Sequence, residues 1–211
     1  MVVLLLVAIP FAVEEMPLAR TYVLEPGASV WDVATEDVNR DGRTDIYVIH
    51  CDEKAEPLQK CVSLFLAGPS GGYARTPSVL LELDPEAGAV FLAEADGVAP
   101  KELVSADSQG AVIYRYNGEA LERSIELEFP SLFPSGTKRP IFLQNIAQDL
   151  DGDGRDEWLI PVLAGYEIRT VAGPLGMVAC DVESEARQSD GVYVYHRLPA
   201  PYVFGSKEAN P

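Results

Sequence analysis

Two short acidic segments in the same register constrain the fold of this chain most strongly. Each places oxygen-bearing side chains at its first, third and fifth positions, a glycine at its sixth position and a carboxylate at its ninth. The glycine permits the sharp turn that lets these oxygens converge, and converging oxygens suit a hard cation such as calcium. The segments are Asp37-Val38-Asn39-Arg40-Asp41-Gly42-Arg43-Thr44-Asp45 and Asp149-Leu150-Asp151-Gly152-Asp153-Gly154-Arg155-Asp156-Glu157.

We predict one calcium ion in each segment, held by side-chain oxygens and by the backbone carbonyl of the seventh residue. The predicted ligands are Asp37, Asn39, Asp41, Arg43 and Asp45 in the first segment, and Asp149, Asp151, Asp153, Arg155 and Glu157 in the second. Asp, Asn and Gly also form ordinary turns through side-chain bonds to the backbone. Two matches in register favour the cation, whose role would be to hold the turn against repulsion between carboxylates.

The flanking residues indicate strands on both sides of each segment. An EF-hand would be flanked by helices and would carry a bidentate Glu at position twelve, where this chain has Val48 and Ile160. The residues before and after the two segments are instead short and rich in β-branched or aromatic side chains. They are 30–34 and 46–51 around the first segment, and 141–146 and 158–163 around the second.

A strand, a D-x-[DN]-x-D-G-x-x-[DE] loop and an apolar strand together resemble the FG-GAP or VCBS-type repeat of integrin-α-like β-propellers. The Phe-Gly and Gly-Ala-Pro elements of that family have partial counterparts in Ala67-Gly68-Pro69 and Ala172-Gly173-Pro174. The resemblance implies an all-β fold made of propeller-type blades, each with four antiparallel strands. It also implies binding of proteins or polysaccharides through loops on one rim.

The spacing of the two segments predicts a third repeat between them. Asp45 and Glu157 are 112 residues apart, about twice the length of one four-stranded blade. Residues 91–104 have the matching pattern in decayed form, with Glu102 in the ninth position and Glu94 and Val98 in the first and fifth. We therefore expect three blades and two metal sites, in repeats of about 28–85, 86–138 and 139–205 within a domain of residues 21–211.

Strand-like segments and turn residues fill these repeats. The predicted strands are 31–37, 45–51, 62–67 and 78–83, then 91–95, 103–105, 111–116 and 124–129, then 141–148, 157–162, one between Tyr166 and Ala179, and 192–197. One helical turn is expected at 182–188. Three blades cannot surround an axis, so the propeller is open or incomplete. The chain is a fragment, closes with another copy or protein, or forms an open array.

Residues 1–20 and the cysteines bear on the cellular compartment. The apolar run from Met1 to Ala12 is too short to span a bilayer and is either a signal-peptide remnant or a first buried strand. Cys51 and Cys61 either form a disulfide or remain thiols, and Cys180 is either buried or paired with another chain. Calcium is abundant outside the cytosol, which favours a secreted, periplasmic or cell-surface protein.

Charge and motifs narrow the function. A net charge of −17 disfavours nucleic acid and anionic membranes as partners. The sequence has no Gly-x-Ser-x-Gly or His-Glu-x-x-His motif and no phosphate-binding glycine loop, and His50 and His196 are interpreted as structural or surface residues. Trp31 and Trp158 are expected to fill blade interfaces.

We expect a binding or assembly module and not an enzyme. The alternatives are an accessory or catalytic domain of a polysaccharide-active enzyme, which a rim cluster of Lys, Arg, Tyr and His would favour, and a structural subunit of a cell-surface assembly.

Overall fold

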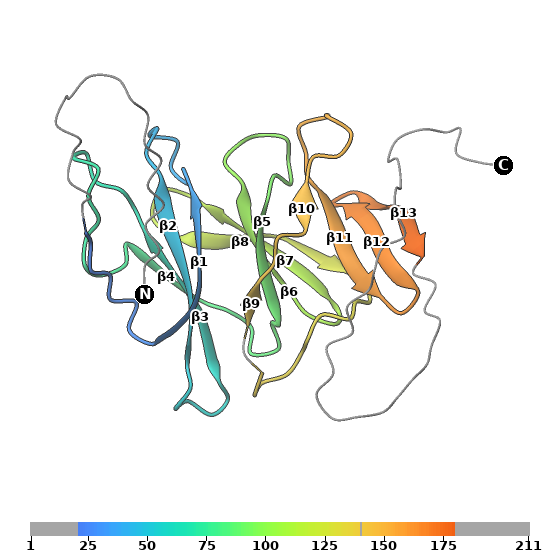
Figure 1. The fold of residues 1–211 in the computed structure, drawn as a ribbon, viewed down its shortest axis with the longest axis horizontal. Helices are drawn as coiled ribbons and strands as arrows, with labels where there is room; N and C mark the ends of the chain where they lie inside the picture. The colour runs from blue at the N-terminus through green and yellow to red at the C-terminus, as the bar shows by residue number, and fades with distance from the viewer. Residues whose placement is uncertain (1–20, 140, 180–211) are drawn as a thin grey trace, which may run out of the picture.

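The secondary structure is built entirely from strands. The computed structural model of the chain describes residues 21–139 and 141–179. Within these residues there are thirteen β-strands and no helix, which confirms the all-β prediction. The strands form three sheets that lie side by side, and the sheets do not close into a ring (Figure 1). The fold is therefore an open, incomplete propeller-type array.

The first and third sheets are up-and-down meanders in chain order, and the middle sheet is such a meander with one added strand. The first sheet contains β1 (Ser29–Glu36), β2 (Asp45–Asp52), β3 (Gln59–Phe65) and β4 (Val79–Glu82). The middle sheet contains β5 (Ala89–Ala93), β6 (Glu102–Ala106), β7 (Gly110–Tyr116), β8 (Leu121–Glu128) and β9 (Phe142–Leu143), in the order β8-β7-β6-β5-β9. The third sheet contains β10 (Ala147–Gln148), β11 (Glu157–Val162), β12 (Gly165–Thr170) and β13 (Gly173–Ala179).

The middle sheet has a fifth strand that the sequence did not predict. Residues 141–148 were expected to form one strand of the third sheet, but the structure divides them between two sheets. β9 pairs in parallel with β5, whereas β10 pairs with β11. The amides of Phe142 and Gln144 donate to the carbonyls of Gly88 and Val90 at 3.3 and 2.7 Å. The prediction of four antiparallel strands is thus wrong for this sheet.

The third sheet already has four strands before residue 180. Two strands, β12 and β13, occupy the segment from Tyr166 to Ala179 in which one strand was expected. The predicted strand at 192–197 and helical turn at 182–188 lie outside the described residues, as do the segment 1–20, Cys180 and His196. The predicted repeat boundaries and the meaning of the N-terminal run stay predictions.

Burial patterns explain which strands lie inside the array. β2 and β6 are buried along almost their whole length, on both faces, and each lies between two other strands of its sheet. The outer strand β8 alternates instead, so that Leu121, Ile125 and Leu127 are more buried than the Glu and Arg residues between them. This period of two is typical of a strand with one face in water.

Two apolar cores hold the three sheets together. The core between the first and middle sheets includes Tyr47, Ile49, Val62, Leu64, Val90, Leu103 and Tyr114. The core on the other side of the middle sheet includes Phe91, Val104, Ile113, Phe129, Trp158 and Ile160. Successive residues of β5, β6 and β7 thus point alternately into the two cores. The middle sheet is apolar on both faces because it has a neighbour on each side.

The two tryptophans behave differently. Trp158 is fully buried in the second core and meets Phe91 edge to face, with ring centroids 5.2 Å apart, as predicted for a residue at a sheet interface. Trp31 lies on β1 against Phe142, with centroids 5.9 Å apart, and remains 38% exposed. Trp31 therefore contacts the middle sheet, to which β9 and Phe142 belong, but it lies at the edge of this interface and does not fill it.

Of the two alternatives for Cys51 and Cys61, the structure has the pair of thiols. Cys51 and Cys61 are both buried free thiols. The register of β2 and β3 pairs Cys51 with Lys60, and Cys61 with His50. Because successive side chains of a strand alternate between faces, the two thiols point to opposite sides of the sheet and cannot be bridged. Burial raises the pKa of the Cys61 thiol to about 11, so this thiol stays protonated near neutral pH.

Candidate metal centre

Three loops at one rim of the array connect the first two antiparallel strands of each sheet (Figure 1). We call residues 37–44, 94–101 and 149–156 the first, middle and third loops. The carboxylate that follows each loop accepts a hydrogen bond from the amide seven residues earlier. These bonds are Val38 to Asp45 at 3.0 Å, Ala95 to Glu102 at 3.0 Å and Leu150 to Glu157 at 2.7 Å. All three loops are therefore closed in the same way.

The third loop brings three predicted ligands together. Asp149, Asp151 and Asp153 each offer a carboxylate oxygen, and these oxygens lie within 4.8 Å of one another. Gly152 and Gly154 have φ angles of 80° and 87°, and their amides donate to the Asp149 carboxylate at 2.7 and 3.1 Å. Among the described residues, no Lys or Arg forms an ion pair with any of these three carboxylates. The arrangement could hold a metal ion.

The first loop has a similar backbone but a different electrostatic state. The amides of Asp41 and Gly42 donate to the Asp37 carboxylate at 3.0 and 2.8 Å. In the third loop the Gly154 amide makes the equivalent bond to Asp149, whereas the Asp153 amide donates to Asp151. Its carboxylates do not form a group of three like that of the third loop, because the third position is the amide Asn39. The Arg43 guanidinium folds back onto Asp41 at 2.5 Å and occupies one oxygen of a predicted ligand.

The ninth-position carboxylates serve the loop backbone. Asp45 is fully buried, and its second oxygen accepts the amide of Ala67 at 2.7 Å. Glu157 is 4% exposed. Neither belongs to a group of converging carboxylates in the described part of the chain. The structure assigns both residues to loop closure, while their role as metal ligands and that of the Arg43 and Arg155 carbonyls stay predictions.

The middle loop keeps a cluster of carboxylates although its sequence pattern is incomplete. Glu94, Asp96 and Glu102 bring three carboxylate oxygens within 4.8 Å of one another, although Val98 stands in the fifth position. Arg115, from β7, pairs with both Asp96 and Glu102 at 2.6 Å. Burial, together with the nearby Glu102 charge, raises the pKa of Glu94. The sequence pattern missed this cluster because it requires an oxygen at every position.

Further contacts join the three loops along the rim. The Arg40 guanidinium donates to the Val98 carbonyl at 3.2 Å and so links the first and middle loops. Asp156 is 4% exposed and accepts hydrogen bonds from the Glu94 amide at 2.8 Å and the Lys101 ammonium at 2.7 Å. Sequence reasoning gave no role to Asp156 or Lys101. The one sequence signal for a role of Asp156 is that an acidic residue stands directly before the ninth position, Glu157.

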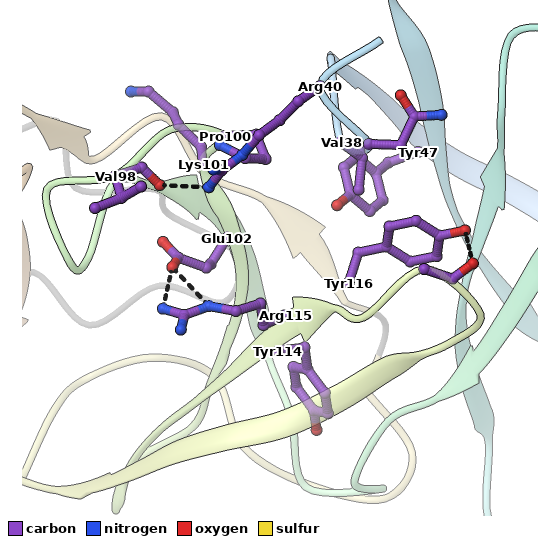
Figure 2. A pocket seen from close by; sticks show the side chains of 12 residues that line it. Val38, Arg40, Tyr47, Val98, Pro100, Lys101, Glu102, Tyr114, Arg115 and Tyr116 are labelled. Carbon is purple, nitrogen blue, oxygen red and sulfur yellow. Dashed lines mark hydrogen bonds and ion pairs between the residues drawn. The ribbon is translucent and has the colours of Figure 1, made fainter.

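A pocket of about 260 Å³ opens between the first and middle loops (Figure 2). Its polar lining comprises Asn39, Arg40, Lys101, Glu102 and Arg115, and its aromatic lining comprises Tyr47, Tyr114 and Tyr116. The Tyr116 hydroxyl donates to the Gly118 carbonyl at 2.7 Å. Burial, with added repulsion from Glu36, Asp45 and Glu102, raises the pKa of Tyr47, so its phenol remains neutral.

No histidine lines this pocket. His50 lies elsewhere, buried in β2, with its Nε2 atom 2.8 Å from the Ser63 hydroxyl. Burial lowers the pKa of His50, which favours the neutral ring. The interpretation of His50 as a structural residue therefore agrees with its surroundings.

Comparison of the chain with known protein families, with curated proteins and with solved structures found no match. The likeness to FG-GAP or VCBS-type repeats therefore depends on the loops and strands themselves. No helix within residues 21–139 and 141–179 has the length and apolar character that a membrane crossing requires.

Proposed function

We propose that this chain is a secreted, calcium-stabilised module of the propeller type that binds a protein or a polysaccharide and is not an enzyme. One observation carries the proposal. Asp149, Asp151 and Asp153 converge at the rim without any compensating cation from the described part of the chain. Three like charges this close repel one another, and a bound dication would turn that repulsion into attraction.

The ligand types favour calcium over other metals. The third loop offers carboxylate oxygens and backbone carbonyls, and it has no imidazole or thiolate such as zinc prefers. Calcium accepts six to eight oxygens in flexible geometry, so an exposed loop with added water molecules can complete its shell. Magnesium demands a tighter octahedron and gives up its water reluctantly. An exposed site of this kind binds calcium weakly, and the calcium concentration outside the cytosol is high enough to fill it.

The first loop would hold a second calcium ion with lower affinity than the third loop. Its Asn39 oxygen is neutral, and the Arg43 guanidinium must leave Asp41 before that carboxylate can bind a cation. Both features reduce the attraction for a dication relative to the third loop. The ions would fix the turns between the first and second strands, so their contribution is to stability and to the shape of the rim.

Calorimetric titration with calcium, together with melting in calcium and in chelator, tests this proposal. We expect two sites in the wild type, one in Asp153→Ala and none in the double variant Asp41→Ala, Asp153→Ala. Glu119→Ala, a change of the same charge at an exposed turn position, should keep both sites. A protein whose melting temperature is the same in calcium and in chelator, and which shows no saturable heat, would contradict the proposal.

The pocket between the first and middle loops favours a polysaccharide as the partner and keeps a second function open. The partly exposed ring of Tyr116 can pack on a sugar ring, whereas Tyr47 and Tyr114 are buried beneath the pocket. Arg40 and Lys101 supply positive charge on a strongly acidic protein. The same features suit an accessory or catalytic domain of a polysaccharide-active enzyme. Incubation with polyuronate oligosaccharides separates the two: binding with no new reducing ends supports a module, whereas new ends support an enzyme.

A further inference from the structure

We infer that Arg115 supplies from within the chain the positive charge that the middle loop needs, and thereby determines which loops of the rim take up calcium. The inference depends on the proposed calcium function of the first and third loops. It assigns Arg115 a specificity-determining role: the guanidinium stands where the other two loops would hold a dication.

The geometry at the middle loop supports this assignment. One Nη atom of Arg115 lies 2.6 Å from both the Asp96 and the Glu102 carboxylates, and its Nε atom donates to Glu102 at 3.2 Å (Figure 2 shows the contact with Glu102). The Glu102 side chain is only 4% exposed, whereas Arg115 is 47% exposed. The guanidinium thus covers a buried carboxylate from the solvent side, which is the direction from which an ion would enter.

The ligand positions of the three loops correspond one to one. Glu94 stands where Asp37 and Asp149 stand, because each lies eight residues before its ninth-position carboxylate. Val98 replaces the fifth-position aspartate, yet its amide still donates to Glu94 and Asp96 at 2.8 Å. The middle loop has therefore kept its turn, lost one oxygen ligand and gained an internal cation.

Strand register shows why only this sheet can place a cation there. The ladders between the second and third strands of the sheets pair Leu103 with Tyr114, Ile46 with Phe65, and Trp158 with Arg169. One step further along each ladder stand Arg115, Leu66 and Thr170, opposite the ninth-position carboxylates. Leu66 and Thr170 carry no charge. The first and third loops thus have no cation opposite the ninth-position carboxylate; in the first loop Arg43 pairs instead with the fifth-position Asp41, from within the loop itself.

A dication and this guanidinium would compete for the same oxygens. The hydrogen bond to Glu102, the main cause, and the surrounding carboxylates raise the pKa of Arg115 further, so the side chain cannot leave by losing its proton. A calcium ion entering the cluster would have to displace a fixed positive charge. The middle loop is accordingly independent of calcium, and the rim binds two ions instead of three.

The full chain with Arg115→Gln tests the inference, with metal content measured after equilibrium dialysis against calcium. We expect two ions in the wild type and three in Arg115→Gln. In chelator, the variant should melt about 5 °C below the wild type, because three carboxylates lose their counter-charge, and calcium should restore it. Arg115→Lys keeps the charge and should bind two ions. Arg123→Gln, at an exposed position of the neighbouring strand, should match the wild type.

An unchanged ion count in Arg115→Gln would overturn the inference, and so would a variant that melts in chelator as the wild type does. If the wild type binds no calcium, the proposed function fails, while a gain from no ions to one in the variant still supports the role of Arg115. A variant that folds only in calcium also supports it. If Arg115→Gln folds under neither condition but Glu102→Gln, Arg115→Gln folds, calcium does not replace the guanidinium and the inference is wrong.

Discussion

At the scale of single residues, Lys60 places a positive charge in the protein interior. Its side chain is buried in β3, with 1% of the residue exposed, and no carboxylate pairs with it among the described residues. The ammonium donates instead to the carbonyls of Pro85, Ala87 and Gly136, at 2.6 Å for Pro85 and 3.2 Å for Gly136. Burial lowers the pKa of Lys60. Pro85 and Ala87 belong to the connection before β5 and Gly136 to the connection before β9, so one side chain ties both connections to the first sheet.

Replacing Lys60 with methionine should lower the free energy of unfolding by about 2 kcal/mol. Methionine fills a similar volume but leaves the three carbonyls without their donor, and a buried acceptor without a partner costs about 1–3 kcal/mol. Chemical denaturation measures the change. Lys54→Met, at an exposed position of the same hairpin, is the matched control and should alter stability by no more than about 0.5 kcal/mol. Equal effects of the two substitutions would show that the carbonyl contacts of Lys60 contribute nothing.

At the scale of strands, the join between β5 and β9 is the tightest point of the middle sheet. Gly88 directly precedes β5, donates to the Ala106 carbonyl at 2.9 Å and accepts from the Phe142 amide. A Cβ atom built on Gly88 would lie 1.4 Å from the Pro134 carbonyl oxygen. Because the obstacle is backbone, no side-chain rotation can relieve the clash. The segment before β9 can cover the sheet only because residue 88 has no side chain.

Gly88→Ala should therefore destabilise the protein by about 3 kcal/mol, through displacement of the segment that carries Pro134 and the loss of pairing by β9. Thermal melting measures the loss of stability, and faster amide exchange of Phe142 and Gln144 would locate it. Gly176→Ala in β13 is the control, since a Cβ there meets nothing within 4 Å. A Gly88→Ala protein as stable as this control would contradict the predicted clash.

Most strands could be predicted from the sequence, and the main error concerns the segment whose partner strand the sequence does not determine. Alternation and turn residues located the four strands of the first sheet to within a few residues, because each is a short apolar run between turns. The prediction of one strand at residues 141–148 is wrong because their apolar character is the same whether they pair with β5 or with β11. Only tertiary pairing decides that choice.

The site shows the same limit. The spacing of aspartates and glycines gave the turns of the first and third loops and the convergence of Asp149, Asp151 and Asp153. It could not give Arg115, which lies 13 residues after Glu102 and reaches the loop through the register of β6 and β7. The choice between a disulfide and two thiols was left open for a related reason, since nearness in a hairpin does not fix which face a side chain occupies.

At the scale of the whole molecule, acidity dominates the electrostatics. The chain has 33 acidic and 16 basic side chains, and several of the acidic ones gather at one rim. Self-repulsion of this size destabilises a compact state, and dissolved salt weakens it. The screening length falls from about 30 Å at 0.01 M salt to about 8 Å at 0.15 M.

We therefore expect the melting temperature in chelator to rise by several degrees when potassium chloride is raised from about 0.01 M to about 0.15 M. In saturating calcium the same change of salt should produce a smaller rise, because bound dications have already removed part of the repulsion. Scanning calorimetry under the four conditions makes the comparison. A melting temperature that stays constant or falls with salt in chelator would show that net charge does not limit the stability of this fold.

The division of residues 141–148 between two sheets has a consequence for how such a protein can change length. A gene segment that begins at the start of residues 141–148 would carry β9 away from the middle sheet, and one that begins after this stretch would lack β10. Loss or duplication of a single unit at this boundary would break the middle sheet, whereas an exchange that moves the middle and third sheets together would leave the shared stretch intact. The boundary between the first and middle sheets has no such bridging strand, which makes it the natural point of recombination.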